Sequence, residues 1–321
     1  MVRRKKLDSL GLKESKNLEK DASSTKIETN SSRLTTFKIS GKVESVIQGQ
    51  ETGEQLRKYF WEEYSALTSQ RAEIFDDLKT SLLIKTRPFE FSHYQRILKT
   101  KYLDTPLSAM GSVRDPTGGG RFNIGDIDPS RFPPFPALYL ASDKKTARLE
   151  FFGPIISGGS LSDRYEQALS LPESIAEFSI SGKIEEVLDI SKSSNLKPYF
   201  DHIKHFTYPE HLHILGDEIG LERRSIATSP SNLLNSIMGF YWKEFPTLFS
   251  VPSTSQILGQ IAWLAGIEAI LYKSIRGTGR CLAIFSQNFI NSPSFIELDD
   301  ATPPGINLIN RLDKSSWESL I

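Results

Sequence analysis

The 321-residue sequence contains a single cysteine, Cys281. One cysteine cannot form an internal disulfide framework or a Cys-x-x-Cys metal knuckle, so both kinds of site are excluded and a reducing compartment is indicated. The residues that follow it, Leu-Ala-Ile-Phe (282–285), are all apolar. This setting predicts a buried strand residue rather than a nucleophile.

Long apolar runs are also missing. No run approaches the ~20 residues that a membrane-spanning helix requires. The basic start, MVRRKKLDSLGLKES, is not followed by an apolar segment, so it does not match a secretory signal. We therefore expect a cytoplasmic protein without a membrane partner.

The sequence has no excess of charge of either sign, with 39 Lys and Arg against 39 Asp and Glu. The distribution is uneven, because residues 1–40 hold ten basic and five acidic side chains. Nucleic-acid binding usually leaves a strongly basic patch. A modestly basic tail on an acidic body therefore argues against a nucleic-acid partner.

Several nucleotide and hydrolase motifs are absent. The glycine run at 117–123 is not followed by Gly-Lys-Ser/Thr, so it is not a P-loop, and no strand–GxGxxG–helix context surrounds it. No Gly-x-Ser-x-Gly elbow and no set of kinase motifs is present. P-loop, Rossmann, serine-hydrolase and kinase chemistry are thus disfavoured.

A metal site is also not expected. Four of the five histidines lie close together, and their HxxH and HxH spacings could present pairs of imidazoles to one metal. However, no carboxylate or cysteine is placed to complete the ligand set, so we interpret them as polar contacts around a loop. They are His202, His205, His211 and His213.

The first part of the chain divides into a tail and a helical extension. Residues 1–45 are rich in polar residues and predict a disordered tail. Residues 46–87 form an amphipathic extension, with apolar residues at helical spacing from about 53 to 84, either continuous or broken once. Pro88 disfavours helix in the residue before it and ends the segment. The helix either packs on the body or binds a partner, and packing is the commoner outcome.

The remainder shows short strands mixed irregularly with helices. We predict a helix over 143–152 with Asp143 as its N-cap, and another over 253–265 that ends at Gly266. Irregular alternation favours an α+β fold over a doubly wound parallel sheet. The apolar runs read as strands are 137–141, 175–180, 187–190, 269–272 and 281–285.

Three segments could carry chemistry. In 117–123, three glycines permit close approach of a ligand, and Arg121 offers a planar fork of donors. In 137–150, a strand with Tyr139 leads to a helix with Glu150. In 269–279, a buried strand ends in Ser274 and Arg276. Each also has an ordinary interpretation, respectively as a turn, a surface charge and a satisfied hairpin end.

Taken in order, these segments resemble the RES domain family. The shared pattern is a Gly-Gly-Arg-Phe-Asn loop at 119–123, Leu-Tyr-Leu-Ala at 138–141, Thr-Ala-x-x-Glu at 146–150 and Tyr-x-Ser-x-Arg at 272–276. Tyr-Gln-Arg-Ile at 94–97 and the helix that begins at Gln256 also resemble the family. The sequence departs from the pattern in its proline-rich loop between Arg121 and Tyr139, in Ala269, where a glycine is usual, in the long stretch 191–255 and in the N-terminal extension.

The resemblance implies an ADP-ribosyltransferase-like split mixed β-sheet flanked by helices. It assigns residues 88–295 to a RES catalytic domain and 296–321 to a C-terminal extension. The family's compact members are toxins that degrade NAD⁺ with phosphate or water, need no cofactor, and are restrained by an Xre-type helix-turn-helix antitoxin. Some related members ADP-ribosylate a protein instead.

The resemblance also implies roles for individual residues. Glu150 would oppose the charge that develops on the ribose, and Tyr139 would stack on nicotinamide. Arg121 would hold the pyrophosphate or an attacking phosphate. Ser274 would bind the ribose or support Glu150. The expected substrate-binding residues are Gly119, Gly120, Asn123 and Arg276.

Three functions follow as hypotheses. The first is an NAD⁺ glycohydrolase or phosphorylase that acts as a toxin or defence effector. The second is an ADP-ribosyltransferase that modifies a protein or nucleic acid at the same site. The third is a non-enzymatic nucleotide-binding module that uses the amphipathic helix to bind a partner.

Overall fold

The computed structural model describes residues 43–153, 175–221, 226–301 and 308–320. All of these lie in one contact unit, Ile39–Ile321. The predicted disordered tail therefore falls almost entirely outside the described residues. The domain boundaries expected at 87/88 and 295/296 stay predictions.

The N-terminal extension folds as two helices, α1 (Val43–Glu73) and α2 (Phe75–Leu83), separated at Ile74. The predicted helix is thus confirmed, and of the two alternatives left open it is the one broken once, although α1 begins about ten residues before the expected start. Phe60 on α1 and Leu78 on α2 are buried in the main apolar cluster, so packing within the chain is confirmed as well. No helix among the described residues has the length and apolar character needed to cross a membrane.

Seven strands form one mixed sheet in the order β1-β2-β5-β4-β3-β6-β7. Because β1 also pairs with β3, the first five strands in this order close into a barrel-like sheet. Among the described strands, only β3 and β4 pair in parallel, which confirms α+β over a doubly wound fold. The strands are β1 (Thr86–Lys99), β2 (Leu138–Ala141), β3 (Ile175–Asp189), β4 (Ala269–Lys273), β5 (Arg280–Ile284), β6 (Phe295–Leu298) and β7 (Arg311–Leu312).

One strand prediction was wrong. The two strands expected at 175–180 and 187–190 are a single strand, β3. Gly182, inside this strand, pairs with Phe91 and lies where β6 passes closely, since a Cβ there would be 2.5 Å from the Phe295 carbonyl oxygen. The glycine therefore permits a close backbone approach rather than a turn.

The central strands are buried on both faces. Leu138, Leu271 and Leu282 belong to one apolar cluster, whereas Tyr272 and Cys281 face the other. A sheet covered on both faces explains the continuous apolar runs that identified these strands in the sequence.

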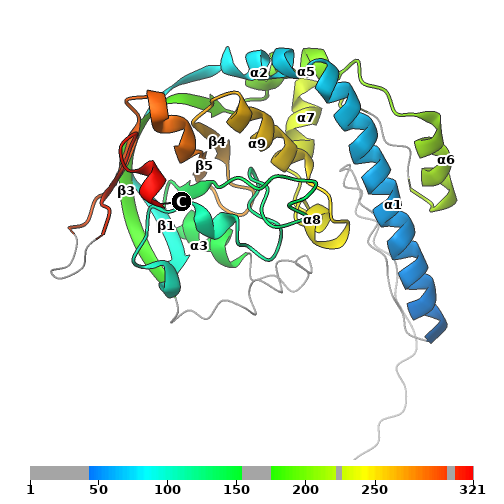
Figure 1. The fold of residues 1–321 in the computed structure, drawn as a ribbon, viewed down its shortest axis with the longest axis horizontal. Coiled ribbons are helices and arrows are strands. Elements are labelled where there is room, and N and C mark those ends of the chain that lie inside the picture. The colour runs from blue at the N-terminus through cyan, green and yellow to red at the C-terminus, as the bar shows by residue number, and fades with distance from the viewer. Residues whose placement is uncertain (1–42, 154–174, 222–225, 302–307, 321) are drawn as a thin grey trace, which may run out of the picture. The chain divides into compact units, whose positions relative to one another are not determined.

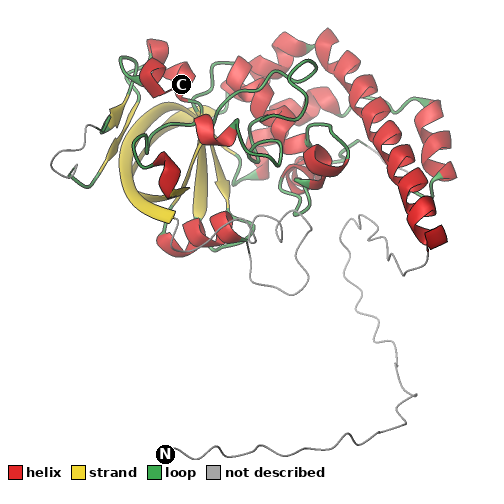
Figure 2. Ribbon diagram, turned by 60° about the horizontal axis from the view of Figure 1, so that its bottom comes forward, coloured by secondary structure: helices red, strands yellow, loops and turns green. Residues whose placement is uncertain are grey.

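Helices cover the sheet and extend beyond it. The predicted N-cap at Asp143 and the predicted stop at Gly266 are confirmed, because Asp143 accepts a hydrogen bond from the Thr146 amide and Gly266 follows α9 (Thr254–Leu264) at φ +84°. The structure adds a capping box between Ser253 and Gln256 at the start of that helix. Figures 1 and 2 show the curved strands at one side of the fold and α1 at the other. The other α-helices within the described residues are α3 (Lys144–Phe152), α5 (Lys197–Ile203), α6 (Glu210–Glu218), α7 (Pro230–Ile237), α8 (Glu244–Leu248) and α9 (Thr254–Leu264). Short 3₁₀ turns lie at Thr100–Tyr102, Met110–Ser112, Ser193–Leu196, Ser286–Asn291 and Trp317–Leu320.

Candidate active site

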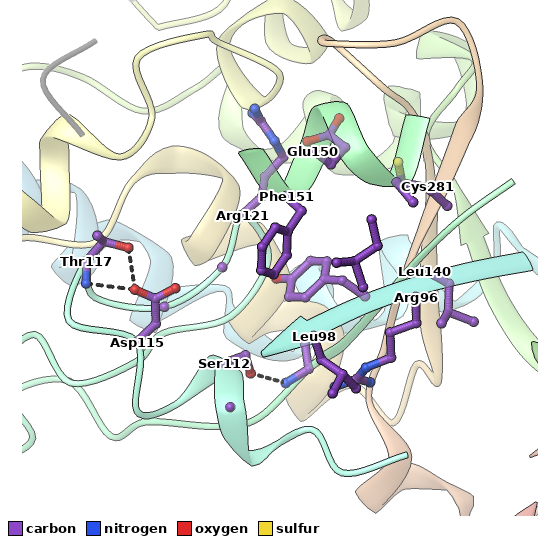
Figure 3. A pocket seen from close by; sticks show the side chains of 18 of the residues that line it. Arg96, Leu98, Ser112, Asp115, Thr117, Arg121, Leu140, Glu150, Phe151 and Cys281 are labelled. Atoms are coloured by element: carbon purple, nitrogen blue, oxygen red, sulfur yellow. Dashed lines mark hydrogen bonds between the residues drawn. The ribbon is translucent and has the colours of Figure 1, made fainter. Parts of the chain in front are cut away.

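A cavity of about 340 Å³ opens beside the face of the sheet that carries Tyr139, Tyr272 and Cys281. The residues that line it come from four strands (β1, β2, β4 and β5), from α3, and from loops that include the glycine loop and the segment after α7. In Figure 3, Arg121 and Glu150 lie near one another, with Arg96 and Leu98 elsewhere on the wall. Six of the eight expected site residues line the cavity, namely Gly119, Gly120, Arg121, Tyr139, Glu150 and Arg276.

Glu150 and Ser274 meet directly, although 124 positions separate them in the chain. The Ser274 hydroxyl donates to Glu150 Oε1 at 2.5 Å and accepts from the amides of Arg276 (3.1 Å) and Gly277 (2.7 Å). A serine hydroxyl has one proton and two lone pairs. The two amides therefore direct that proton to the Glu150 carboxylate.

The turn after β4 locks against the start of α3. The Gly279 amide donates to Thr146 Oγ1 at 3.1 Å, and a Cβ at Gly279 would lie 2.3 Å from Asp143 Oδ2. The Arg276 Nη1 donates to the Glu150 carbonyl oxygen at 3.2 Å. These contacts fix where α3 places Glu150 relative to the end of β4.

The glycine loop is held by α9. Gln256 is completely buried, and its Nε2 donates to the carbonyl oxygens of Gly118 (2.9 Å), Asn123 (3.1 Å) and Gly120 (3.2 Å). Gly119 has φ +105°, a backbone conformation that glycine adopts without strain. In the sequence, Gln256 was noted only as part of a segment that resembles the family. In the structure, its side chain bonds to the glycine loop.

Asn123 is fully buried and is not among the described residues that line the cavity. Its Oδ1 accepts from the Gly120 amide and from the Tyr139 hydroxyl, each at 2.9 Å. Its Nδ2 donates to the carbonyl oxygens of Ser112 and Phe135. The structure thus does not place this expected substrate contact at the cavity, because its amide is used to shape the loop.

The Tyr139 ring lines the cavity, whereas its hydroxyl is used internally. The hydroxyl donates to Asn123 and accepts from the Phe122 amide at 2.9 Å. Burial raises the pKa of the Tyr139 hydroxyl well above its ordinary value. Tyr139 is therefore a neutral aromatic wall rather than an acid or base.

Arg121 is buried, with its side chain against the end of α7. Its Nη1 donates to the carbonyl oxygens of Gly239 at 3.1 Å and Ile237 at 3.4 Å. Its guanidinium carbon lies 5.3 Å from the centre of the Trp242 ring. Burial lowers the pKa of Arg121, and the nearby Tyr272 and Glu150 oppose that shift.

The cavity is strongly basic. Seven of the lining residues carry positive charge and two carry negative charge, and a cleft with such an excess concentrates anions. The basic residues are Arg96, Lys99, Lys101, Arg114, Arg121, Lys243 and Arg276, and the acidic ones are Asp115 and Glu150.

Sequence reasoning gave Arg96 no role. Arg96 lies on β1. Its Nη2 donates to the Ser108 carbonyl oxygen at 2.7 Å, and its buried Nη1 has no hydrogen-bond partner among the described residues. Burial lowers the pKa of Arg96 to about 10. The available signal was an arginine within the Tyr-Gln-Arg-Ile strand at 94–97.

Cys281 also lines the cavity and is buried on β5, as predicted. Burial raises the pKa of its thiol far above the ordinary value of 9.0. A thiol that stays protonated is a poor nucleophile.

The histidines lie away from this cavity. His211 contacts Glu62 at 3.2 Å, and His202 and His213 lie on α5 and α6. Within the described ranges, no group of three His, Cys, Asp or Glu residues is arranged to hold a metal ion.

The sequence profile of the RES domain matches residues 93–300. The chain belongs to the RES domain family. This match contains every residue of the cavity described above and leaves α1 and α2 outside it.

Among solved structures, the chain is similar to one in the crystal structure of the M. tuberculosis MbcT–MbcA toxin–antitoxin complex. The identity is 18%, the TM-score is 0.38, and the similarity covers 76% of this chain and 96% of that chain. No curated protein matches the sequence.

Proposed function

We propose that this RES-domain protein is an enzyme that cleaves the nicotinamide–ribose bond of NAD⁺, as a glycohydrolase or phosphorylase. The single observation that carries the proposal is the Glu150 carboxylate at the wall of a basic cavity, held by the Ser274 hydroxyl at 2.5 Å. Family membership supports the same chemistry, and it also supports an ADP-ribosyltransferase-like interpretation of the closed mixed sheet.

The reaction needs one carboxylate. Nicotinamide leaves as a neutral base, because its ring nitrogen is already cationic in NAD⁺ and takes the electron pair of the broken bond. The ribose then carries oxocarbenium character, as in glycoside cleavage. Glu150 opposes that positive charge and accepts a hydrogen bond from the ribose 2′-hydroxyl. Water or phosphate adds to the anomeric carbon and, in hydrolysis, releases a proton.

The other cavity residues bind the substrate. Arg121 and Arg276 contact the pyrophosphate or an attacking phosphate, since guanidinium groups recognise such anions through paired hydrogen bonds. The buried Nη1 of Arg96, which has no hydrogen-bond partner in the described part of the chain, provides a further donor for a ligand oxygen. The Tyr139 ring stacks on nicotinamide with the offset geometry that aromatic pairs prefer. No cofactor is required by this scheme.

The test is release of nicotinamide from NAD⁺ by the purified full chain, with and without phosphate. We expect Glu150→Gln to lower the rate at least about 100-fold, the scale of losing one electrostatic contact to the transition state. Glu185→Gln is the control, because Glu185 pairs with Lys183 on β3 and is not a lining residue. Nicotinamide release that is nil in the wild type, or unchanged in Glu150→Gln, overturns the proposal.

The same assay distinguishes the alternatives. Transfer of labelled ADP-ribose to a protein or nucleic acid would identify an ADP-ribosyltransferase. Binding of NAD⁺ without turnover would identify a nucleotide-binding module.

A biological role follows from the proposed chemistry. An enzyme that consumes cytoplasmic NAD⁺ would act as a toxin or defence effector, and an Xre-type antitoxin would be its partner. Expression of the wild type in a bacterial host should lower cellular NAD⁺ and arrest growth, whereas Glu150→Gln should do neither.

A further inference from the structure

Trp242 belongs to the long segment 191–255, which gave no functional signal in the sequence. This residue is 7% exposed and lines the basic cavity. Two cations that line the same cavity lie over this one ring, with Arg121 Cζ 5.3 Å and Lys243 Nζ 5.5 Å from its centre.

This arrangement has an electrostatic cause. Two like charges brought together in a partly desolvated wall repel each other, whereas the negative face of an indole attracts each of them. The end of α7 adds partial negative charge through the carbonyl oxygens of Ile237 and Gly239, which accept from Arg121. The short stretch 237–242 therefore supplies every hydrogen-bond and ring partner that Arg121 has among the described residues.

Only one nitrogen of the Arg121 guanidinium is used in these contacts. Nη1 makes both hydrogen bonds, and within the described part of the chain Nε and Nη2 have no hydrogen-bond partner. A guanidinium held on one edge presents its other donors to a ligand with two acceptor oxygens. The wall of the cavity is thus built to receive an anion.

We propose that Trp242 is a positioning residue that holds Arg121 and Lys243 together as one subsite for the pyrophosphate of the substrate. The inference rests on the proposed function and adds two residues to it. Lys243 supplies a second positive charge, and Trp242 acts through both cations rather than by contact with the reacting atoms.

The test measures binding of ADP-ribose and of inorganic pyrophosphate by calorimetry, together with kcat and KM for NAD⁺. Trp242→Leu should weaken binding of both anions about tenfold, the scale expected when both cations lose their partly desolvated cation–π contact. KM should rise by more than kcat falls. Trp242→Phe keeps an aromatic face and should stay within about threefold of the wild type.

Trp61→Leu is the matched control. Trp61 also carries a cation over its ring, Arg131 at 4.7 Å, but it is not a lining residue of the cavity. Its removal should leave the affinity for ADP-ribose unchanged. The melting temperature of each variant is measured beside its affinity, so that loss of folding is separated from loss of binding.

Lys243→Met provides a second test that does not depend on the core position of Trp242. It should weaken pyrophosphate binding several-fold and make the affinity less sensitive to salt, because one charge contact is lost. The inference is overturned if Lys243→Met and the folded Trp242 variants bind both anions like the wild type. It is also overturned if Trp242→Phe binds as weakly as Trp242→Leu.

The outcomes separate this inference from the proposed function. If the wild type binds ADP-ribose and pyrophosphate through Trp242 and Lys243 but releases no nicotinamide, the inferred subsite is supported and the proposed enzyme activity is refuted. If the wild type releases nicotinamide and the variants bind both anions unchanged, the proposed activity is supported and the inferred subsite is refuted.

Discussion

At the scale of single residues, the cavity depends on side chains whose hydrogen-bonding capacity is already committed. Ser274 has both of its lone pairs occupied by backbone amides, so its proton is directed to Glu150. Tyr139 and Asn123 use their polar atoms on each other and on the glycine loop. Such fixed groups do not need to reorganise when charge develops in a substrate, which is the main source of electrostatic catalysis.

Ser274→Ala tests this dependence. The change removes the hydroxyl that contacts Glu150, and a hydrogen bond to a charged group contributes about 1.5–3 kcal/mol. We expect the rate of nicotinamide release to fall about 10- to 100-fold, mainly in kcat. The melting temperature should also fall, because the amides of Arg276 and Gly277 lose their acceptor. Ser274→Thr retains the hydroxyl and should recover most of the rate. Equal rates for the wild type and Ser274→Ala would show that the hydroxyl does not support Glu150.

At the scale of elements, α9 holds the glycine loop in place by packing and hydrogen bonds. Its capping residue Gln256 binds three loop carbonyls, and its Gly259 lies under the loop, where a Cβ would be 2.0 Å from the Phe122 carbonyl oxygen. The helix and its cap were predictable, since Ser253 and Gln256 have capping-box spacing. The contact of this helix with a loop more than 130 residues earlier was not predictable. Helical periodicity shows which residues share a face of the helix, but not which distant segment packs against that face.

Gly259→Ala should therefore destabilise the protein, although alanine is the better helix former. Overpacking against a fixed backbone costs about 1–3 kcal/mol. The control is Gly53→Ala on α1, where nothing lies within 4 Å of the new Cβ and a gain of up to about 1 kcal/mol is expected. Urea unfolding measures both changes. A Gly259→Ala variant as stable as the wild type would contradict the close approach of helix and loop.

At the scale of the whole molecule, the titratable groups behind the cavity are buried in their neutral forms. Burial raises the pKa of Cys281 above 9.0 and the pKa values of Tyr139 and Tyr272 above 10.0. In the unfolded chain these groups ionise near their ordinary values. Above pH 9 the unfolded state thus binds fewer protons than the folded state, and the free energy of unfolding must fall as pH rises.

We expect the melting temperature to decline from about pH 9, first through Cys281 and then through the tyrosines. Cys281→Ala should flatten the decline between about pH 8.5 and 9.5 and make the decline above pH 10 shallower, because the buried thiol stays protonated in that range while the unfolded thiol is ionised. Calorimetric scans across this range measure the effect. A melting temperature that rises over the same interval would show that the thiol is not buried in its neutral form.

The sequence by itself determined the local structure of this protein. The cap at Asp143, the stop at Gly266 and the buried strands around Cys281 follow from residues that are neighbours in the chain, because caps, turns and apolar runs act over a few positions. It also provided the family resemblance that gathered Arg121, Tyr139, Glu150 and Ser274 into one hypothesis, and all but Ser274 line the cavity directly.

Only the tertiary structure decided what each of these side chains contacts. Arg121 lies against carbonyls 116 and 118 positions away and beside Trp242. The Asn123 side chain bonds within the glycine loop, and Arg96 lines the cavity from β1. The physical reason is that a polar side chain takes its partner from whichever backbone end or aromatic face the fold brings near it. That proximity depends on how distant elements pack, which no local pattern specifies.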